Sequence, residues 1–307
     1  MTDVQDVHPT EKLRTKILRP TNKMKNINNK HLKRDIIIFS IAIFAYIVAW
    51  IVSWIPVKER FDYLVPDCDS PVRIVVISDL HSCYYGKNQK TLLNMIDEEE
   101  PDIIMMPGDI FDDKLKDDNT KTTLEYLVKK YPCYYVTGNH EYWSGRADEM
   151  KEYLRGIGVH VLEGECESVK INGCTLDICG VNDPDGMPMS KWREELDNAY
   201  NSSDASHTRI LLSHRPELVS EYENYDFDLI LAGHAHSGQF RIPFINRGVF
   251  APNQGFFAKY VNGEYKLNSG STMIVSRGLG RESTPLPRYF NNPEILVIDI
   301  YENYPIM

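Results

Sequence analysis

The hydrophobic pattern begins with one long uninterrupted run. Residues 36–55 contain no charged residue, no Gly and no Pro, and twenty residues in a helix match a hydrocarbon core of ~30 Å. Trp50 and Trp54 lie toward the end of the run, where membrane helices carry interfacial aromatic residues. The run therefore predicts a transmembrane helix over residues 36–56. Two alternatives are weaker, because soluble core helices are rarely apolar on every face and no signal-peptide cleavage site follows the run.

Beyond residue 72 short apolar runs alternate with amphipathic segments. Strands are expected at residues 72–78, 102–106, 133–137, 209–213, 228–232, 272–276 and 295–300, and helices at 89–99, 120–130, 146–155, 192–200 and 216–223. Two Asn-Gly dipeptides predict tight hairpins. The hairpins join residues 167–171 to 174–181 and residues 259–261 to 264–266. This order predicts one α/β domain over residues 61–307, with a mixed sheet or two sheets packed face to face and helices outside.

Charge is distributed unevenly along the 307 residues. The chain carries −10, but residues 1–35 carry nine Lys and Arg against four Asp and Glu, so the remainder carries −15. An acidic body argues against a specific nucleic-acid partner, because phosphate backbones require a basic surface. The basic tail, residues 1–35, fits an anionic membrane surface or a solvated arm. Seven Lys and Arg lie within about 20 residues before the apolar run and three within a similar distance after it, which predicts a single-pass cell-membrane protein with a cytoplasmic N-terminus and an extracytoplasmic domain.

Five of the predicted strands are followed at once by Asp, Asn or His. In chain order these residues are Asp79, His81, Asp109, Asn139, His140, His214, His234 and His236. Open α/β sheets place their sites at the carboxyl ends of strands, so we expect these side chains to lie close together. Each motif is weak alone, since a Gly-Asp is usually a turn and an Asn often caps a helix. Together, carboxylate, imidazole and amide oxygen suit Mn, Fe or Zn.

These motifs resemble the five signature blocks of the calcineurin-like metallophosphoesterases. The blocks are Asp79-Leu80-His81, Gly108-Asp109, Gly138-Asn139-His140-Glu141, His214 and Gly233-His234-Ala235-His236. The later segment RYFNNPEI, residues 288–295, is similar to the closing motif of a bacterial subgroup with an N-terminal membrane segment. The resemblance runs over residues 72–300. It implies a four-layer α/β/β/α sandwich preceded by one transmembrane helix.

The resemblance also implies roles for the site residues. The first metal is held by Asp79, His81 and His236, the second by Asn139, His214 and His234, and Asp109 bridges the two, while His140 is no ligand and faces the substrate phosphate as the catalytic acid. The implied cofactors are two divalent ions, Mn, Fe or Zn, that hold a hydroxide. The implied reaction is hydrolysis of a phosphomonoester, phosphodiester or pyrophosphate bond in a small molecule or a lipid at the membrane.

Two other classes of function remain open on these residues. One is a membrane-anchored metal-binding or regulatory protein that has the phosphoesterase fold but little turnover. The complete ligand set together with His140 favours the enzyme over that alternative. The other is a structural metal protein, which is disfavoured because structural zinc sites are usually rich in Cys.

Several further residues invite a functional interpretation. All six cysteines follow the apolar run, which permits disulfides of undetermined connectivity, and the spacing of Cys83 matches no zinc pattern. Asp183 and Asp185 lie in a sequence that predicts a turn rather than a calcium loop. Gln239 and Arg241 are candidates for the pocket wall, with a structural role equally favoured. The segment 277–281, RGLGR, is a candidate loop at the edge of the site.

Overall fold

The computed structural model describes residues 22–65, 68, 70–241, 248–281 and 287–302, and the chain divides into two units, Met1–Val48 and Ala49–Met307. Helix α1 (Asn22–Val52) is the one helix of the described chain that is long and apolar enough to cross a membrane, over Asn29–Val52. The expected tail falls partly outside the described residues, and residues 22–35 are helical.

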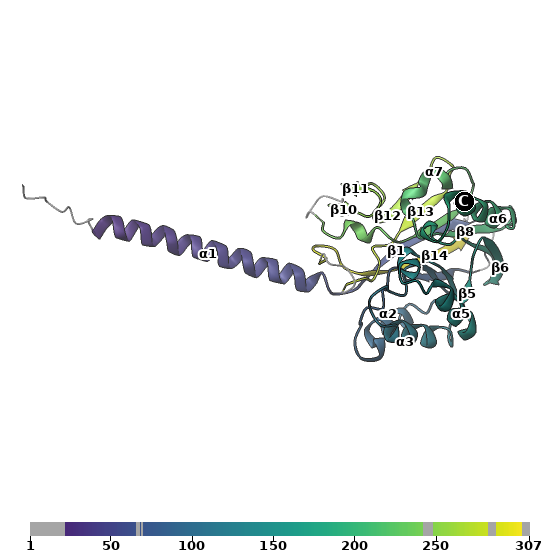
Figure 1. The fold of residues 1–307 in the computed structure, drawn as a ribbon, viewed down its shortest axis with the longest axis horizontal. Helices are drawn as coiled ribbons and strands as arrows, with labels where there is room; N and C mark the ends of the chain where they lie inside the picture. Colours follow the sequence, from purple (N-terminus) through teal and green to yellow (C-terminus); the bar gives the residue numbers. More distant parts are fainter. Residues whose placement is uncertain (1–21, 66–67, 69, 242–247, 282–286, 303–307) are drawn as a thin grey trace, which may run out of the picture. The chain divides into compact units, whose positions relative to one another are not determined.

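Two six-stranded sheets form the second unit (Figure 1). The first sheet has the order β1 (Val57–Val65), β14 (Glu294–Glu302), β2 (Val72–Val76), β3 (Ile103–Pro107), β4 (Cys133–Val136) and β5 (His160–Val161). The second has the order β12 (Gly263–Lys266), β13 (Thr272–Val275), β9 (Leu229–Ala232), β8 (Thr208–Leu212), β7 (Cys174–Gly180) and β6 (Glu165–Ile171). Strands β2 to β5 run parallel, as do β13, β9, β8 and β7. Parallel strands end at one edge, so their following loops converge.

Helices cover the outer faces of both sheets. The helices beside the first sheet are α2 (Lys90–Asp97), α3 (Asp118–Leu127) and α5 (Ala147–Ile157), and those beside the second are α6 (Met189–Asn201) and α7 (Val219–Tyr222). Alternation along β2 illustrates the layers: Ile74 and Val76 pack between the sheets, whereas Val75 packs under the helices. The predicted four-layer α/β/β/α sandwich is therefore confirmed.

Local signals and long-range pairing agree at one predicted hairpin and conflict at the other. The hairpin at Asn172-Gly173 is confirmed as β6–β7. The hairpin at Asn262-Gly263 is wrong, because β12 pairs antiparallel with β13 and no strand forms over residues 259–261. The free edge of β13 offers four aligned residue pairs to β12, and that pairing outweighs the local turn signal.

Strand β1 was not predicted from the sequence. It begins at Val57, before the expected domain start at residue 61, and pairs in parallel with β14 along its whole length. Its exposure alternates, and it carries charged residues as edge strands commonly do. The pairing joins two segments more than 200 residues apart, so periodicity within either segment could not reveal it.

Four of the six cysteines form disulfides. Cys68 pairs with Cys174, and Cys166 pairs with Cys179 directly across the β6–β7 hairpin. Cys83 and Cys133 are buried and lie outside these two disulfides. The Cys83 Sγ accepts a hydrogen bond from the Arg281 backbone N–H and belongs to none of the potential metal-ligand groups among the described residues.

Candidate metal centre

The eight residues singled out from the sequence meet between the ends of strands from both sheets. Asp79, His81 and Asp109 follow β2 and β3, Asn139 and His140 begin α4 (Asn139–Trp143) after β4, and His214, His234 and His236 follow β8 and β9. Five of them, Asp79, His81, Asp109, His234 and His236, have positive φ angles. Non-glycine residues rarely adopt this conformation, and such strain clusters at functional sites.

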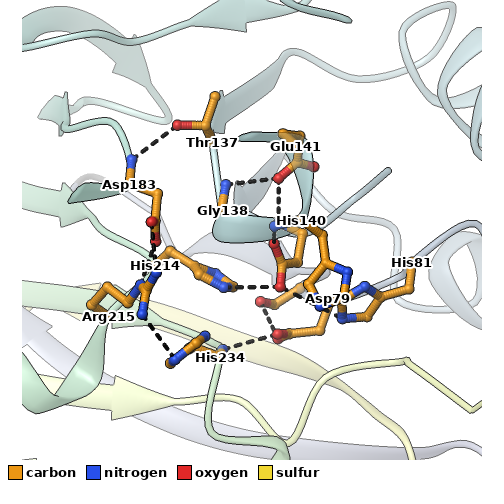
Figure 2. Close-up of polar contacts among 12 residues, drawn as sticks. Asp79, His81, Thr137, Gly138, His140, Glu141, Asp183, His214, Arg215 and His234 are labelled. Carbon is orange, nitrogen blue, oxygen red and sulfur yellow. Dashed lines mark hydrogen bonds and ion pairs between the residues drawn. The ribbon is translucent and has the colours of Figure 1, made fainter. Parts of the chain in front are cut away.

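The potential ligand atoms of the described residues form three groups: one is His81, Asp112 and His140, and the other two lie beside the Asp109 carboxylate. Asp79, His81 and His236 have potential ligand atoms within 4.8 Å of one another, as do Asp109, His214 and His234. The Asp109 Oδ2 lies 3.1 Å from His214 Nε2 and 3.6 Å from His81 Nε2, so it faces both groups. Figure 2 shows the convergence of Asp79, His81, His214 and His234. The arrangement has the form of two adjacent cation sites with a common ligand.

Buried atoms without partners test whether cations fit this arrangement. Asn139 Oδ1 is buried and has no hydrogen-bond partner among the described residues. His81 Nε2 and His236 Nε2 face each other at 3.3 Å. Buried polar atoms normally find partners, because leaving one unsatisfied costs about 1–3 kcal/mol. Divalent cations would satisfy these lone pairs, so the residues fit two metals.

Glycines let the backbone approach the donors closely. A Cβ on Gly138 would overlap the Asp109 carboxylate, which the chain between β4 and α4 must pass. Gly278 has a φ of +70°, and its Cβ would lie 2.5 Å from the Asp79 Cβ. The 277–281 segment thus packs directly on the donors, as expected for a loop at the edge of the site.

Glu141 ties the two loops that carry Asp109 and Asn139. Its Oε1 accepts from the backbone N–H groups of Ile110 and Phe111 at 2.8 and 3.0 Å, and its Oε2 accepts from those of Gly138 and Asp109 at 2.8 and 3.1 Å. Burial and the nearby Asp109 charge raise the pKa of Glu141 to about 7. The sequence predicted no role for Glu141, although an acid at the third position of a helix is a capping signal.

Two carboxylates for which the sequence predicted no role lie next to the Nδ1 atoms of His81 and His140. Asp112 Oδ2 lies 3.3 Å from His81 Nδ1, and Asp113 Oδ1 lies 2.7 Å from His140 Nδ1. Burial opposes protonation of His81, but the hydrogen bond to Asp112 and the charges of the neighbouring carboxylates leave its pKa raised. Burial lowers the pKa of His140. The sequence GDIFDD, residues 108–113, could have indicated both carboxylates, because Asp112 and Asp113 closely follow Asp109.

Two buried arginines, for which the sequence also predicted no role, contact the paired histidines His234 and His236. Arg215 pairs with both carboxylate oxygens of Asp183, and its Nη1 lies 3.2 Å from His234 Nε2 (Figure 2). Arg288, from the closing motif, has its Nη2 3.1 Å from His236 Nδ1. Burial first, and then neighbouring cations, hold the pKa values of His234 and His236 well below the usual range. A lowered pKa favours the neutral imidazole, the form that binds a metal.

The turn predicted at residues 183–186 is confirmed, and it has a second role. Asp183 caps the short 3₁₀ turn Pro184–Gly186: its Oδ1 accepts a 2.9 Å hydrogen bond from the Asp185 N–H. The same carboxylate holds Arg215, and Asp185 lies 3.0 Å from that guanidinium. The turn thus anchors the arginine that contacts His234.

A pocket of about 200 Å³ opens onto the donors. Its wall is formed by Asp109, Asn139, His140, Trp143, His234, Ala235, His236, Gln239, Phe250 and Pro252. Gln239 therefore lines the pocket as the sequence suggested, whereas Arg241 borders a separate hollow beside β12. The lining combines potential metal ligands with an apolar wall that contains Trp143, Phe250 and Pro252.

Comparisons with known proteins agree with this geometry. Residues 72–238 match the model of the calcineurin-like phosphoesterases, and the chain belongs to this family of phosphoester hydrolases. An uncharacterized metallophosphoesterase of Helicobacter pylori is 32% identical over 237 residues, which are 75% of this chain and 60% of that protein. A zebrafish (Danio rerio) transmembrane protein with metallophosphoesterase domain is 26% identical over 76% of this chain and 53% of its own length.

One solved structure illustrates the fold likeness. A dimetal phosphatase from Danio rerio aligns with a TM-score of 0.45 at 13% identity, covering 74% of this chain and 98% of the other. No residue assignment rests on this likeness. The chain also spans less than two thirds of the length of the Helicobacter pylori relative.

Proposed function

We propose that the chain hydrolyses phosphoester bonds with two divalent metals and is anchored in a membrane by α1. The observation that carries the proposal is the pair of donor groups joined by Asp109 at the base of a pocket. Asp79, His81 and His236 are the proposed ligands of the first metal, and Asn139, His214 and His234 those of the second. The donor set of imidazole, carboxylate and amide oxygen favours Mn, Fe or Zn.

The chain's own residues have distinct parts in the proposed reaction. When bound, two such cations would neutralise phosphoryl charge and lower the pKa of water. Asp109 fixes the spacing of the two sites. His140 donates from Nδ1–H to Asp113, and in the imidazolium form, which the Asp113 carboxylate stabilises, its Nε2–H can give a proton to the departing oxygen. Burial of the donors excludes bulk water and strengthens these charge interactions.

Removal and return of metal test this proposal. The full chain in detergent is stripped with a chelator and assayed on p-nitrophenyl mono- and diesters, nucleotides and phospholipids. We expect hydrolysis to vanish and Mn²⁺ to restore it better than Ca²⁺, which prefers all-oxygen sites. Full activity without bound metal would remove the two-metal mechanism. Bound metal with no turnover on any ester would favour the anchored regulatory protein.

We further propose that the tail, residues 1–35, lies in the cytoplasm, that the membrane span lies within residues 36–56, and that the catalytic domain, residues 61–307, is extracytoplasmic. Support comes from the excess of basic residues before the span and from two disulfides in the domain, since disulfides persist in oxidising compartments. Protease added to intact cells stripped of their wall should remove a C-terminal epitope and spare an N-terminal one. Protection of the C-terminal epitope until lysis would overturn this orientation.

A further inference from the structure

Five exposed phenylalanines form a surface that we name the aromatic rim. They are Phe240, Phe250, Phe256, Phe257 and Phe290, with exposed fractions of 40–73%. The rings of Phe250 and Phe256 lie 5.3 Å apart across the small hairpin β10 (Phe250–Ala251) and β11 (Gly255–Phe256). Scattered exposed apolar residues are normal, but a connected group of large ones marks a surface that contacts protein or lipid.

Backbone contacts join the rim into one continuous surface. The Phe257 N–H donates to the Val249 carbonyl, and the Val249 N–H donates to the Phe240 carbonyl, at 3.1 and 2.8 Å. The Phe240 ring lies 5.6 Å from that of Tyr289, the residue before Phe290. The rim therefore consists of three chain segments that contact one another.

The rim is continuous with the apolar wall of the pocket. Phe250 belongs to both, and it lines the pocket together with Pro252 and Gln239, the neighbour of Phe240. Trp143, which is 58% exposed, stands at the same pocket beside His140, with ring centroids 4.8 Å apart. An apolar path thus leads from the potential metal ligands to the outside of the domain.

The same part of the domain holds the end of the apolar helix. The Asn292 side chain donates to the carbonyls of Val52 and Ile55 at 2.8 and 2.9 Å. Arg281 donates to the Trp54 carbonyl at 3.0 Å and stacks over its ring at 5.1 Å. Val52 is the last residue of the candidate membrane span, and Asn292 lies two residues after Phe290. The rim segment that carries Phe290 is therefore attached at the point where the candidate span ends.

We propose that the aromatic rim lies in the interfacial layer of the lipid bilayer and that the enzyme takes a membrane lipid with a phosphoester headgroup. This inference rests on the proposed function. Aromatic side chains favour the interface, and a tether at the span keeps the rim at high local concentration there. Insertion through phenylalanine suits a domain of net negative charge, which gains nothing from anionic lipid by charge alone. The lipid phosphate would enter along the apolar wall while its acyl chains remain near the membrane.

The rim can be tested in the full chain reconstituted in phosphatidylcholine nanodiscs. The lipid probe matches the ester hydrolysed in solution: phosphatidic acid for a monoesterase and phosphatidylglycerol for a diesterase. The double variant Phe256→Ser/Phe257→Ser should lower the ratio of lipid turnover to p-nitrophenyl ester turnover roughly ten-fold or more, as expected for two large apolar side chains lost from a lipid contact. Leu64→Ser is the matched control, since Leu64 is 58% exposed on β1, and it should leave the ratio unchanged.

A second readout tests the contact without any assay of turnover. Tryptophan placed by Phe256→Trp should be quenched by brominated phosphatidylcholine beyond the quenching of the native chain, and Leu64→Trp should not. An unchanged ratio in the double variant together with an unquenched Phe256→Trp would overturn the rim while leaving the proposed hydrolase standing. Cross-linking of two copies that is lost in the double variant would assign the rim to self-association instead. No hydrolysis of any soluble ester would sink the proposed function, and the quenching result would still decide the contact.

Discussion

The two halves of the metal centre use the same kinds of donor but stand against opposite charges. Behind His81 and His140, which come from the loops of the first sheet, lie the carboxylates of Asp112 and Asp113. Behind His234 and His236, which follow β9 of the second sheet, lie the guanidinium groups of Arg215 and Arg288. We call these the acid-backed half and the arginine-backed half.

The opposite charges act on the imidazoles in different ways. An acceptor at Nδ1 holds the ring proton on Nδ1 and leaves the Nε2 lone pair free, as Asp112 does for His81. A guanidinium can only donate, and its charge disfavours the protonated imidazolium, as for His236. The Arg288 contact at Nδ1 and the close approach of Gly280, where a Cβ would lie 3.1 Å from the His236 ring, both orient this ring.

The Asp109 carboxylate faces His81 of the acid-backed half and also His214, so its loss should have the largest effect. Asp109→Asn keeps the volume but removes the charge that faces His81 and His214. We expect metal content to fall by elemental analysis and turnover to fall roughly 10³-fold or more, beyond the loss of one electrostatic donor. Asp177→Asn is the control, because Asp177 is a buried carboxylate on β7 that bonds Ser168. Retention of two metals in Asp109→Asn would contradict a shared carboxylate.

The acid-backed half should separate chemistry from metal binding. His140→Asn should keep both metals and lose roughly 10²–10⁴-fold in turnover on an ester with a poor leaving group, the usual worth of acid catalysis. Asp113→Asn should lose less, because Asn still accepts from Nδ1 but carries no charge to stabilise the imidazolium. Wild-type turnover in His140→Asn would show that this histidine is not the acid.

Removing the backing charge should shift the pH dependence of metal binding in opposite directions in the two halves. Arg288→Met removes a cation beside His236 and so raises the pKa of that histidine, which moves metal binding to higher pH. Asp112→Asn removes an anion beside His81 and so lowers the pKa of that histidine, which moves metal binding to lower pH. Asp112→Asn should also cost about 10–100-fold in metal affinity at neutral pH. Metal titrations at several pH values check this, and shifts of the same sign in both variants would refute the contrast.

The smallest expected effect concerns the link between loops inside the acid-backed half. Glu141→Gln would turn an amide NH₂ toward two of the four backbone N–H groups that the carboxylate now satisfies. We expect a loss of about 1–3 kcal/mol in the free energy of unfolding, the cost of buried donors left unpaired. Urea unfolding of the detergent-solubilised chain measures it, with Glu152→Gln on the exposed side of α5 as the control. Equal stability of the two variants would argue against this role for Glu141.

The donors could be found from the sequence because their positions depend on local rules. Asp79 and Asp109 each follow a short apolar strand, and parallel strands bring such positions to one edge whatever the strand order. The same reasoning predicted the strands that precede His214 and His234, within a residue or two of their observed ends. The arginine beside His236 obeys no such rule. Arg288 reaches His236 from a segment 52 residues later, and no periodicity links the two.

The sequence by itself determined the apolar helix, the layered α/β class, the set of candidate metal ligands and the turn at Asp183. These features depend on short-range periodicity and on residue chemistry. The tertiary structure alone decided that β1 pairs with β14 and that β12 pairs with β13 instead of forming the Asn-Gly hairpin. It also decided which charged side chain contacts each histidine. Strand partners and buried ion contacts form between distant segments, and they are selected by the packing free energy of the whole domain rather than by any local preference.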